Sequence, residues 1–261
     1  MYDLAKLDAE LAGTPFSGKL HFARVTGSTN ADATAAARDG APHGSVFFAD
    51  EQKAGRGRGD HGWISAAGEG LYVSVLLRLQ IAANRLPLLP LAAGLAAAES
   101  IRAVSGSSVD LRWPNDLLIG PRKTGGILVE SSLQTKGLLH AMVVGIGINV
   151  HQRVFPSGLA TPATSLDLEA GKIIPRQTLL IALLKSLERE ASALAREASA
   201  KEILARVEQA STWIRGRNVQ VHGPQACTGV TAGLDEHGFL RVATADGLVT
   251  VQTGGLRESS F

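Results

Sequence analysis

The nearly continuous apolar run LLHAMVVGIGINV restricts the fold of this chain more than any other feature of its sequence. From it we predict a strand over Leu138–Asn149. A strand with apolar residues at consecutive positions is buried on both faces, so it belongs at the centre of a sheet with a layer on each side. Helical periodicity over Leu88–Val104 and in two later segments supplies such layers. Strands and helices are interleaved without strict alternation, which favours an α/β or α+β fold over a doubly wound sheet.

The other expected elements of this large unit are shorter or more polar. Strands are predicted at Leu20–Val25, Ser45–Ala49, Leu71–Leu79, Val109–Trp113 and Gly126–Ser131. Helices are predicted from Leu4 to Gly13, from a cap among residues 28–30 to Gly40, and over Pro175–Glu197 and Ala200–Thr212.

The pattern changes near Gly216. From there the runs RNVQV, CTGVTAGL, FLRVAT and LVTVQT alternate with the turn signals HGP, DEHG and ADG. Several short strands separated by tight turns are typical of a small β-barrel. We therefore divide the chain into a first unit of residues 1–213 and a β-unit of residues 214–261.

Composition excludes several classes of protein. With 45% hydrophobic and 19% charged residues and a mean hydropathy of +0.10, the chain is neither disordered nor fibrous. No uninterrupted apolar run of about 18 residues occurs, so we expect no transmembrane helix. The single cysteine, Cys227, excludes an intramolecular disulfide and a cysteine-clustered metal site, and we expect it only to pack. That cysteine count and the acidic opening segment MYDLAKLDAELAG favour a reducing cytoplasm over export.

The charge balance bears on nucleic-acid binding. Lysine and arginine number 26 against 24 acidic residues, a net charge of +2. This is too small for a protein whose whole surface binds nucleic acid. A sequence pI of about 8.8 still allows a local basic patch.

The segment from Gln52 to Trp63 has the composition of a ligand-binding loop. Its four glycines allow backbone N–H groups to approach a ligand, and its cations suit phosphate or carboxylate; they are Gly55, Gly57, Gly59, Gly62, Lys53, Arg56 and Arg58. Trp63 offers a flat face to a base or ring. The loop is neither a P-loop nor a dinucleotide-binding turn, because both glycine patterns are absent. A disordered nucleic-acid contact or a solvated hairpin remains an alternative.

Two further segments carry polar groups at strand ends. In RWPNDL, Asn115 and Asp116 follow a strand, and in RKTGGILVE, Lys123 precedes two glycines that open an apolar strand. This places an ammonium group at the edge of a sheet. An ordinary turn and a solvated loop lysine are the alternatives for these two segments. Asn149 ends the central strand with a carboxamide able to read the edge of a base.

Five motifs, GSTN, QKAGRGRG with its following tryptophan, RWPND, RKTGGILVE and GIGINV, occur in this order. In this arrangement the chain resembles the biotin–protein ligases, the biotin–acetyl-CoA-carboxylase ligase family, from about residue 20 to residue 257. The resemblance implies a class II synthetase-like mixed sheet flanked by helices and a small C-terminal SH3-like β-barrel. Repressor-type members carry an N-terminal winged helix-turn-helix. Only about 20 residues precede the first core strand here, so we expect that domain and specific DNA binding to be absent.

The resemblance also implies a reaction. Biotin and ATP form biotinyl-5′-AMP and pyrophosphate, and biotin then passes to one lysine of a biotin carboxyl carrier protein. Because the biotin carboxylate is itself the nucleophile, the first step requires positioning and charge neutralisation rather than a protein nucleophile. Mg²⁺ is expected with ATP, a prosthetic group is not, and the chain is expected to be a monomer or weak homodimer.

Site residues follow from the matching motifs. Lys123 and Arg58 are the expected catalytic residues. The expected biotin-binding residues are Ser28, Thr29, Asn30, Gln52, Arg56, Gly57, Arg58, Lys123 and Gly126, of which Ser28, Thr29 and Gln52 face the ureido ring. The expected nucleotide-binding residues are Arg58, Trp63, Asn115 and Asn149. Asp116 is expected to help hold Mg²⁺ or the incoming lysine.

The glycine-rich loop departs from the family pattern. Relatives commonly read GRGRRGRxW, whereas this chain reads GRGRGDHGW, with a glycine, an aspartate and a histidine at positions 59–61. Fewer cations predict a weaker hold on phosphate. We also expect residues 53–62 to be mobile without ligand, because their glycines carry a large backbone entropy and no large apolar side chain offsets it. A lipoate–protein ligase, a non-enzymatic nucleic-acid-binding protein and an independent C-terminal interaction module remain alternative readings.

Overall fold

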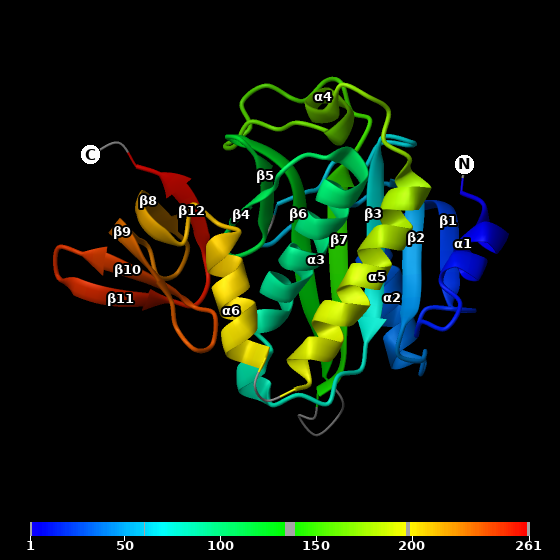
Figure 1. Ribbon diagram of the computed structural model, residues 1–261, viewed down its shortest axis with the longest axis horizontal. Coiled ribbons are helices and arrows are strands. Elements are labelled where there is room, and N and C mark those ends of the chain that lie inside the picture. The colour runs from blue at the N-terminus through cyan, green and yellow to red at the C-terminus, as the bar shows by residue number, and fades with distance from the viewer. Residues whose placement is uncertain (1, 60, 134–138, 197–198, 260–261) are drawn as a thin grey trace.

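The computed structural model describes residues 2–59, 61–133, 139–196 and 199–259 (Figure 1). Its helices are α1 (Leu4–Glu10), α2 (Thr29–Arg38), a 3₁₀ turn η1 (Ala83–Arg85), α3 (Leu88–Ser105), α4 (Leu166–Ala170), α5 (Arg176–Leu194) and α6 (Ser199–Gln209). Strands of the first unit are β1 (Leu20–Thr26), β2 (Ser45–Gln52), β3 (Gly70–Leu77), β4 (Asp110–Arg112), β5 (Asp116–Ile119), β6 (Arg122–Leu133) and β7 (Leu139–Asn149). Those of the β-unit are β8 (Arg215–His222), β9 (Cys227–Leu234), β10 (Leu240–Thr244), β11 (Gly247–Val251) and β12 (Gly255–Glu258).

The first unit is built on a mixed seven-stranded sheet in the order β1-β2-β3-β7-β6-β5-β4. Only the β1–β2 pair is parallel among the described pairs, and the others are antiparallel. The predicted mixed sheet is therefore confirmed, and β7 lies at its centre. The expected start of this strand, Leu138, lies outside the described residues.

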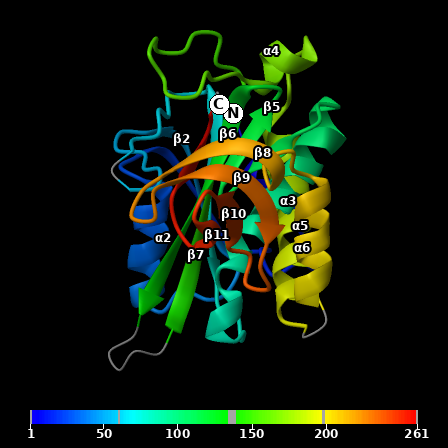
Figure 2. The ribbon, with the colours of Figure 1, turned by 90° about the vertical axis from the view of Figure 1, so that its left-hand side faces the viewer.

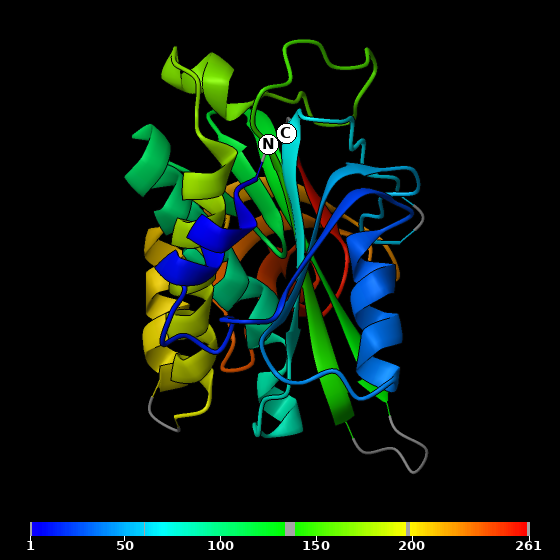
Figure 3. The same cartoon turned by 90° about the vertical axis from the view of Figure 1, so that its right-hand side faces the viewer.

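Both faces of β7 are covered, as its apolar run predicts. Val143 packs with Ala33 and Ala37 of α2, whereas Val144 and Ile146 belong to the larger core on the other face. Figure 3 shows α2 alone on one side of the sheet and α1, α3 and α5 on the opposite side. The alternation of side chains along a strand explains why neighbouring residues enter different cores.

Helix α3 is the central helix of the larger core. By length and composition it is apolar enough to cross a membrane, but 67% of it is buried within the fold. It packs against α5, α6 and strands β4, β5 and β6, so its apolar surface is used inside the protein. Gly106 ends the helix in the left-handed conformation, at a φ of +83°.

The sequence patterns missed several short elements, among them β5 beside the RWPND motif and helix α4. Asn115 and Asp116 were expected in a turn, but Asp116 begins β5 and pairs with Arg112 and with Gly126 on either side. Strand β6 also starts at Arg122, four residues before its predicted beginning, so Lys123 lies within a strand. The five-residue helix α4 is too short to give a periodic signal.

The β-unit forms a five-stranded antiparallel sheet in the order β11-β10-β9-β8-β12. Figure 2 shows this sheet in front of the first unit, with α2 to one side and α3, α5 and α6 to the other. Trp113 Nε1 donates across the boundary to Gly238 O at 3.0 Å, and the Gly238 backbone packs on Leu88 and Leu91. The two units therefore share a buried contact.

Candidate active site

One cavity of about 630 Å³ lies between the glycine-rich loop, the large sheet and the β-unit. Strands β6 and β7, the start of α2 and the turn before β12 all contribute to its wall. Every site residue expected from the sequence lines it: Ser28, Thr29, Asn30, Gln52, Arg56, Gly57, Arg58, Trp63, Asn115, Asp116, Lys123, Gly126 and Asn149. The tertiary structure thus brings together segments that are more than 100 residues apart in sequence.

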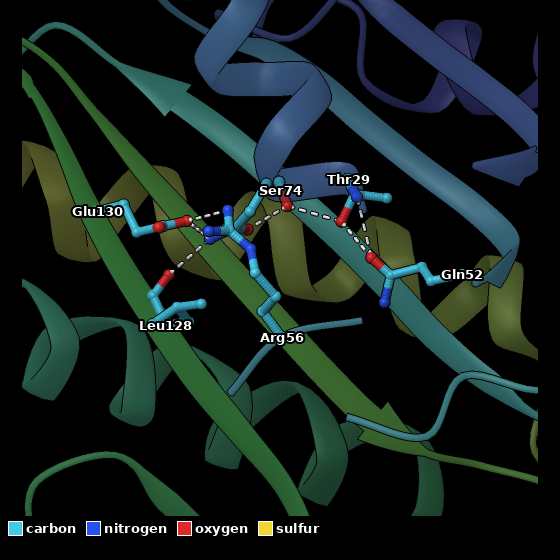
Figure 4. A network of polar contacts seen from close by, with 7 residues as sticks. Thr29, Gln52, Arg56, Ser74, Leu128 and Glu130 are labelled. Atoms are coloured by element: carbon cyan, nitrogen blue, oxygen red, sulfur yellow. Dashed lines mark hydrogen bonds and ion pairs between the residues drawn. The ribbon is translucent and has the colours of Figure 1, made fainter. Parts of the chain in front are cut away.

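The start of α2 forms a polar floor to the cavity (Figure 4). The Thr29 backbone N–H donates to Gln52 Oε1 at 2.9 Å, and Gln52 Nε2 donates to Ser65 Oγ at 2.8 Å. Ser28 caps the helix by its extended backbone conformation and makes no capping hydrogen bond through its side chain. Polar groups of Ser28, Thr29 and Gln52 therefore converge where the sequence predicts a ureido ring to bind.

Asn30 lies behind this floor rather than facing a ligand with a free amide. Its Oδ1 is 2.5 Å from Ser74 Oγ, and its Nδ2 donates to Glu130 Oε2 at 2.8 Å. The side chain fits because residue 145 is glycine: a Cβ there would lie 2.0 Å from Asn30 Oδ1. Asn30 still lines the cavity, and its amide takes part in a buried network that supports the polar floor.

The glycine-rich segment forms a hairpin. Gly57 N–H donates to His61 O at 2.7 Å and Trp63 N–H donates to Gly55 O at 2.8 Å. These paired amides offset part of the entropy of ordering the glycines, a contribution that the expectation of a mobile loop did not include. Of the three positions that depart from the family pattern, Gly59 and His61 line the cavity, and Asp60 lies outside the described residues.

Trp63 projects from the hairpin onto β7. A Cβ at Gly147 would lie 2.6 Å from Trp63 Nε1, so the indole packs directly on the glycine backbone. Lys123 Nζ is 5.5 Å from the indole centroid, within the range of a cation–π contact. The buried Nε1 has no hydrogen-bond partner in the described part of the chain, which leaves a donor in the cavity wall.

Lys123 and Arg112 converge on Asp116. Lys123 Nζ lies 2.5 Å from Asp116 Oδ1, and Arg112 Nη2 lies 2.6 Å from Asp116 Oδ2. Burial by itself raises the pKa of Asp116, but the charges and hydrogen bonds of the two cations outweigh it and hold the pKa below its usual value. The ammonium group is thus held at the sheet by an ion pair, and the expectation of a solvated loop lysine is wrong.

Arg58 joins the hairpin to the β-unit. Its Nη1 donates to Gly254 O at 2.8 Å, and its Nη2 donates to Thr253 Oγ1 at 2.9 Å. A longer contact of 3.4 Å reaches Asn115 Oδ1. Burial lowers the pKa of Arg58, and the charge of Asp116 acts in the opposite direction.

The amide donors of the two predicted nucleotide-binding asparagines already have partners. Asn115 Nδ2 donates to Ile127 O at 2.7 Å, and Asn149 Nδ2 donates to Thr164 O at 3.0 Å. Both residues line the cavity, but these bonds fix the shape of its wall. Nothing in the sequence indicated the contact between Asn149, at the end of β7, and the segment that returns through Thr164.

The cavity is strongly cationic. Among the described residues that line it, Asp116 is the only carboxylate, whereas the full cations are Arg56, Arg58, Arg112, Lys123 and Arg257. Such a wall favours a ligand with several negative charges. It does not suit a resident metal ion, because the one carboxylate already binds two cations and no cluster of three metal-ligating side chains occurs in the described chain.

Sequence reasoning missed several residues of this site. Ser65, Ser74 and Glu130 bind the polar floor, and Arg112, Thr253 and Gly254 hold Asp116 or Arg58. Arg112 and Glu130 lie within the recognised motifs RWPND and RKTGGILVE, which is the signal that could have found them. Residues between Val154 and Ala163 also line the cavity, and this segment has no such motif.

Comparisons with known proteins agree with this arrangement. Residues 22–149 match the Biotin/lipoate A/B protein ligase family. The chain is 35% identical over 237 residues to a Biotin--[acetyl-CoA-carboxylase] ligase of Mycobacterium tuberculosis, covering 88% of this chain and 85% of the relative. It is 38% identical over 167 residues to the Bifunctional ligase/repressor BirA of Bacillus spizizenii, covering 63% of this chain. That match spans about half of the BirA protein, 51% of its length.

Among solved structures, the chain is similar to the biotin protein ligase of Aquifex aeolicus in complex with biotin and ATP. The TM-score is 0.80 at 30% sequence identity, covering 93% of this chain and 100% of that chain. The similarity includes both the large sheet and the small β-unit, since it extends over almost the whole chain.

Proposed function

Because the chain belongs to the biotin/lipoate A/B protein ligase family, we propose that it is a biotin–protein ligase that forms biotinyl-5′-AMP and transfers biotin to a lysine of a carrier protein. The proposal rests on the observation that two chemically different walls face the same cavity. One wall is the polar floor of Ser28, Thr29 and Gln52, and the other contains Arg58 and Lys123.

The floor suits the head of biotin. A ureido group has two N–H donors and one carbonyl acceptor, and a site that pairs all of them discriminates strongly against ligands that lack them. Gln52 Oε1 provides an acceptor, and the Ser28 hydroxyl can donate to the carbonyl. The valeryl chain then extends along Gly126 toward Lys123, which places the biotin carboxylate among the cations.

Formation of the adenylate requires attack of a biotin carboxylate oxygen on the α-phosphorus of ATP, with pyrophosphate as the leaving group. Negative charge gathers on the phosphoryl oxygens during this step. Lys123 and Arg58 would neutralise it, after Lys123 has exchanged its contact with Asp116 for the reacting groups. The side chains required are cations and donors, which is what the cavity contains.

The nucleotide would occupy the end of the cavity near Trp63. The Trp63 indole lines the cavity and suits stacking on adenine, and Arg58 tethers the hairpin to the β-unit beside it. Mg²⁺ would enter with the triphosphate, since the described donor set does not form a metal site of its own. We attribute no step of the reaction to a protein-bound metal ion.

Transfer requires the amine of the acceptor lysine to attack the carbonyl carbon of the mixed anhydride, releasing AMP. Asp116 is the only carboxylate among the described lining residues, so we propose that it orients the incoming amine. The acceptor is proposed to be a lysine of a biotin carboxyl carrier protein. A lysine side chain is long enough to enter a cavity that the carrier domain itself does not fit.

The test uses purified protein, MgATP and radiolabelled biotin or lipoate, each with and without a carrier domain. We expect acid-labile biotinyl-AMP with biotin and ATP alone, and a stable covalent label on the carrier when it is added. Label transfer from lipoate instead of biotin would assign the other activity of the family. Failure of both acids to form an adenylate would contradict the proposal.

A further inference from the structure

Glu130 does not line the cavity, yet it binds two residues that do. Its Oε2 accepts from Asn30 Nδ2 at 2.8 Å and from Arg56 Nη2 at 2.9 Å (Figure 4). Asn30 is 5% exposed, so its amide has little access to water. The carboxylate is therefore the outer end of a buried hydrogen-bond chain that runs through Asn30 to the polar floor.

The number of available hydrogens determines which group donates in each bond of this hydrogen-bond chain. A carboxylate only accepts, and Leu128 O, 3.4 Å from Asn30 Nδ2, also only accepts, so the Asn30 amide must turn its NH₂ group toward both. Asn30 Oδ1 then faces Ser74 Oγ at 2.5 Å. The single hydroxyl hydrogen of Ser74 is committed to that oxygen.

The hydrogen-bond chain continues from Ser74 through Thr29 to Gln52, and the same count of hydrogens applies. Ser74 Oγ also lies 2.7 Å from Thr29 Oγ1, and that contact needs the hydrogen of Thr29 because Ser74 has none left. Thr29 then has no hydroxyl hydrogen for Gln52 Oε1, which is 3.1 Å away and takes only the Thr29 backbone N–H. One lone pair of Gln52 Oε1 remains for a ligand.

We propose that Glu130 is a positioning residue of the biotin subsite, whose carboxylate fixes the direction of this chain and thereby keeps Gln52 Oε1 as an open acceptor for a ureido N–H. The inference rests on the proposed function, since it names biotin as the donor of that N–H. Without the acceptor at position 130, only the long 3.4 Å contact with Leu128 O holds the Asn30 NH₂ group in this direction, so the amide can rotate and the hydrogen-bond chain can reverse. The Thr29 hydroxyl would then donate to Gln52 and compete with the ligand.

The experiment compares the biotin Kd of the full-length protein with that of three single variants and one double variant by calorimetry. Glu130→Met removes the acceptor at similar volume, and we expect a Kd about three- to tenfold higher, the loss associated with one hydrogen bond. Glu130→Gln retains a carbonyl acceptor without the charge and should stay within about twofold of the parent. Ser74→Ala interrupts the hydrogen-bond chain, so adding Glu130→Met to the Ser74→Ala variant should not change the Kd further.

Three outcomes would overturn the inference. An unchanged Kd for a folded Glu130→Met variant would show that the chain direction does not matter. A loss in Glu130→Gln equal to that in Glu130→Met would assign the effect to charge acting on Arg56. A full additional loss in the Ser74→Ala background would place the effect of Glu130 outside the chain. Failure of the parent protein to bind biotin would instead refute the proposed function, so the two failures are distinguishable.

Discussion

At the scale of single residues, Lys123 and Asp116 form an ion pair in which Lys123 Nζ lies 2.5 Å from Asp116 Oδ1. Each side chain affects the state of the other. The carboxylate holds the ammonium at the cavity wall, and the ammonium helps to keep the carboxylate ionised. The proposed reaction uses this pair in a definite order, because Lys123 must leave Asp116 to reach the phosphoryl oxygens. Asp116 keeps its second partner, Arg112, while Lys123 is away.

Replacement of Lys123 by alanine should slow adenylate formation by about 10²–10³, the usual cost of removing one donor to a developing oxyanion. The measurement is single-turnover formation of biotinyl-AMP. Lys53→Ala is the matched control, because Lys53 is an exposed lysine paired with Glu51 and does not line the cavity. A Lys123→Ala rate within a few-fold of the parent would remove Lys123 from the catalytic step.

Asp116 also predicts a pH dependence of stability. Its pKa is lower in the folded protein than in the unfolded chain, so its stabilisation is present above about pH 4 and is lost as the pH falls through the folded value. Asp116→Asn should reduce the free energy of unfolding by about 1–3 kcal/mol near pH 7, because two cations lose their partner. This difference from the parent should shrink below about pH 4 in urea titrations.

Asp246→Asn is the control for this titration, since Asp246 is an exposed turn residue. Its difference from the parent should be small at every pH. A difference between the Asp116→Asn variant and the parent that persists unchanged into acid would contradict the role of the charged pair.

At the scale of elements, the glycines of β7 decide what can lie on the sheet. Gly145 makes room for Asn30 and Gly147 makes room for Trp63, on the strand at the centre of the fold. A strand of large apolar residues alone would exclude both side chains. Strand β7 thus packs in the core through its apolar residues, and its glycines leave room for the side chains of Asn30 and Trp63.

Gly147→Ala should displace the Trp63 indole and raise the KM for ATP about tenfold, because overpacking of this kind costs about 1–3 kcal/mol. The control is Gly94→Ala in α3, where the nearest atom would be 3.6 Å from the new Cβ. That variant should retain the parent KM and be more stable by about 0.5–1 kcal/mol. An unchanged KM in a folded Gly147→Ala protein would show that the nucleotide does not depend on the position of Trp63.

The hairpin of residues 52–65 gives a prediction for amide hydrogen exchange. The Gly57 and Trp63 amides, which are bonded across the hairpin, should show measurable protection without ligand, and the protection should rise strongly with biotin and MgATP. The Lys53 and Ala54 amides, bonded to Thr26 and Gly27, report the base of the hairpin as an internal control. Protection that does not change when the adenylate is bound would place the closing element elsewhere.

At the scale of the whole molecule, the β-unit contributes directly to the cavity. Arg58 reaches residues almost 200 positions away, and Trp113 donates to Gly238 across the same boundary. The guanidinium that would neutralise phosphate is therefore oriented by a part of the chain that the nucleotide-binding motifs do not include. This arrangement disfavours the reading of the β-unit as an independent module.

Removal of the hydroxyl at position 253 tests this connection. Thr253→Ala should raise the KM for ATP about three- to tenfold and leave the biotin Kd unchanged, because one hydrogen bond to Arg58 is lost. Thr250→Ala, at an exposed threonine of β11, is the control and should change neither constant. Equal effects of the two variants would show that Arg58 is not positioned by the β-unit.

Local patterns in the sequence were sufficient for most of the elements. The apolar run of β7, the periodicity of α3 and α5, and the turn signals of the β-unit depend on neighbouring residues, so they can be read without knowing the fold. The ordered motifs also identified part of the cavity lining, but not the residues between Val154 and Ala163. Boundaries were less certain where polar residues start a strand, as Asp116 and Arg122 do.

Only the tertiary structure decided which partner each polar group takes. Asn149 donates to Thr164, Asn30 to Glu130, and Arg58 to Gly254, and these pairs are separated by 15 to 196 positions. A sequence specifies the donor and acceptor capacity of each side chain, but buried groups satisfy that capacity with whichever atoms the packing brings near. The sequence motifs therefore predicted a set of residues that lie together at one cavity. Their hydrogen-bond partners depend on how the sheet, the hairpin and the β-unit close around that cavity.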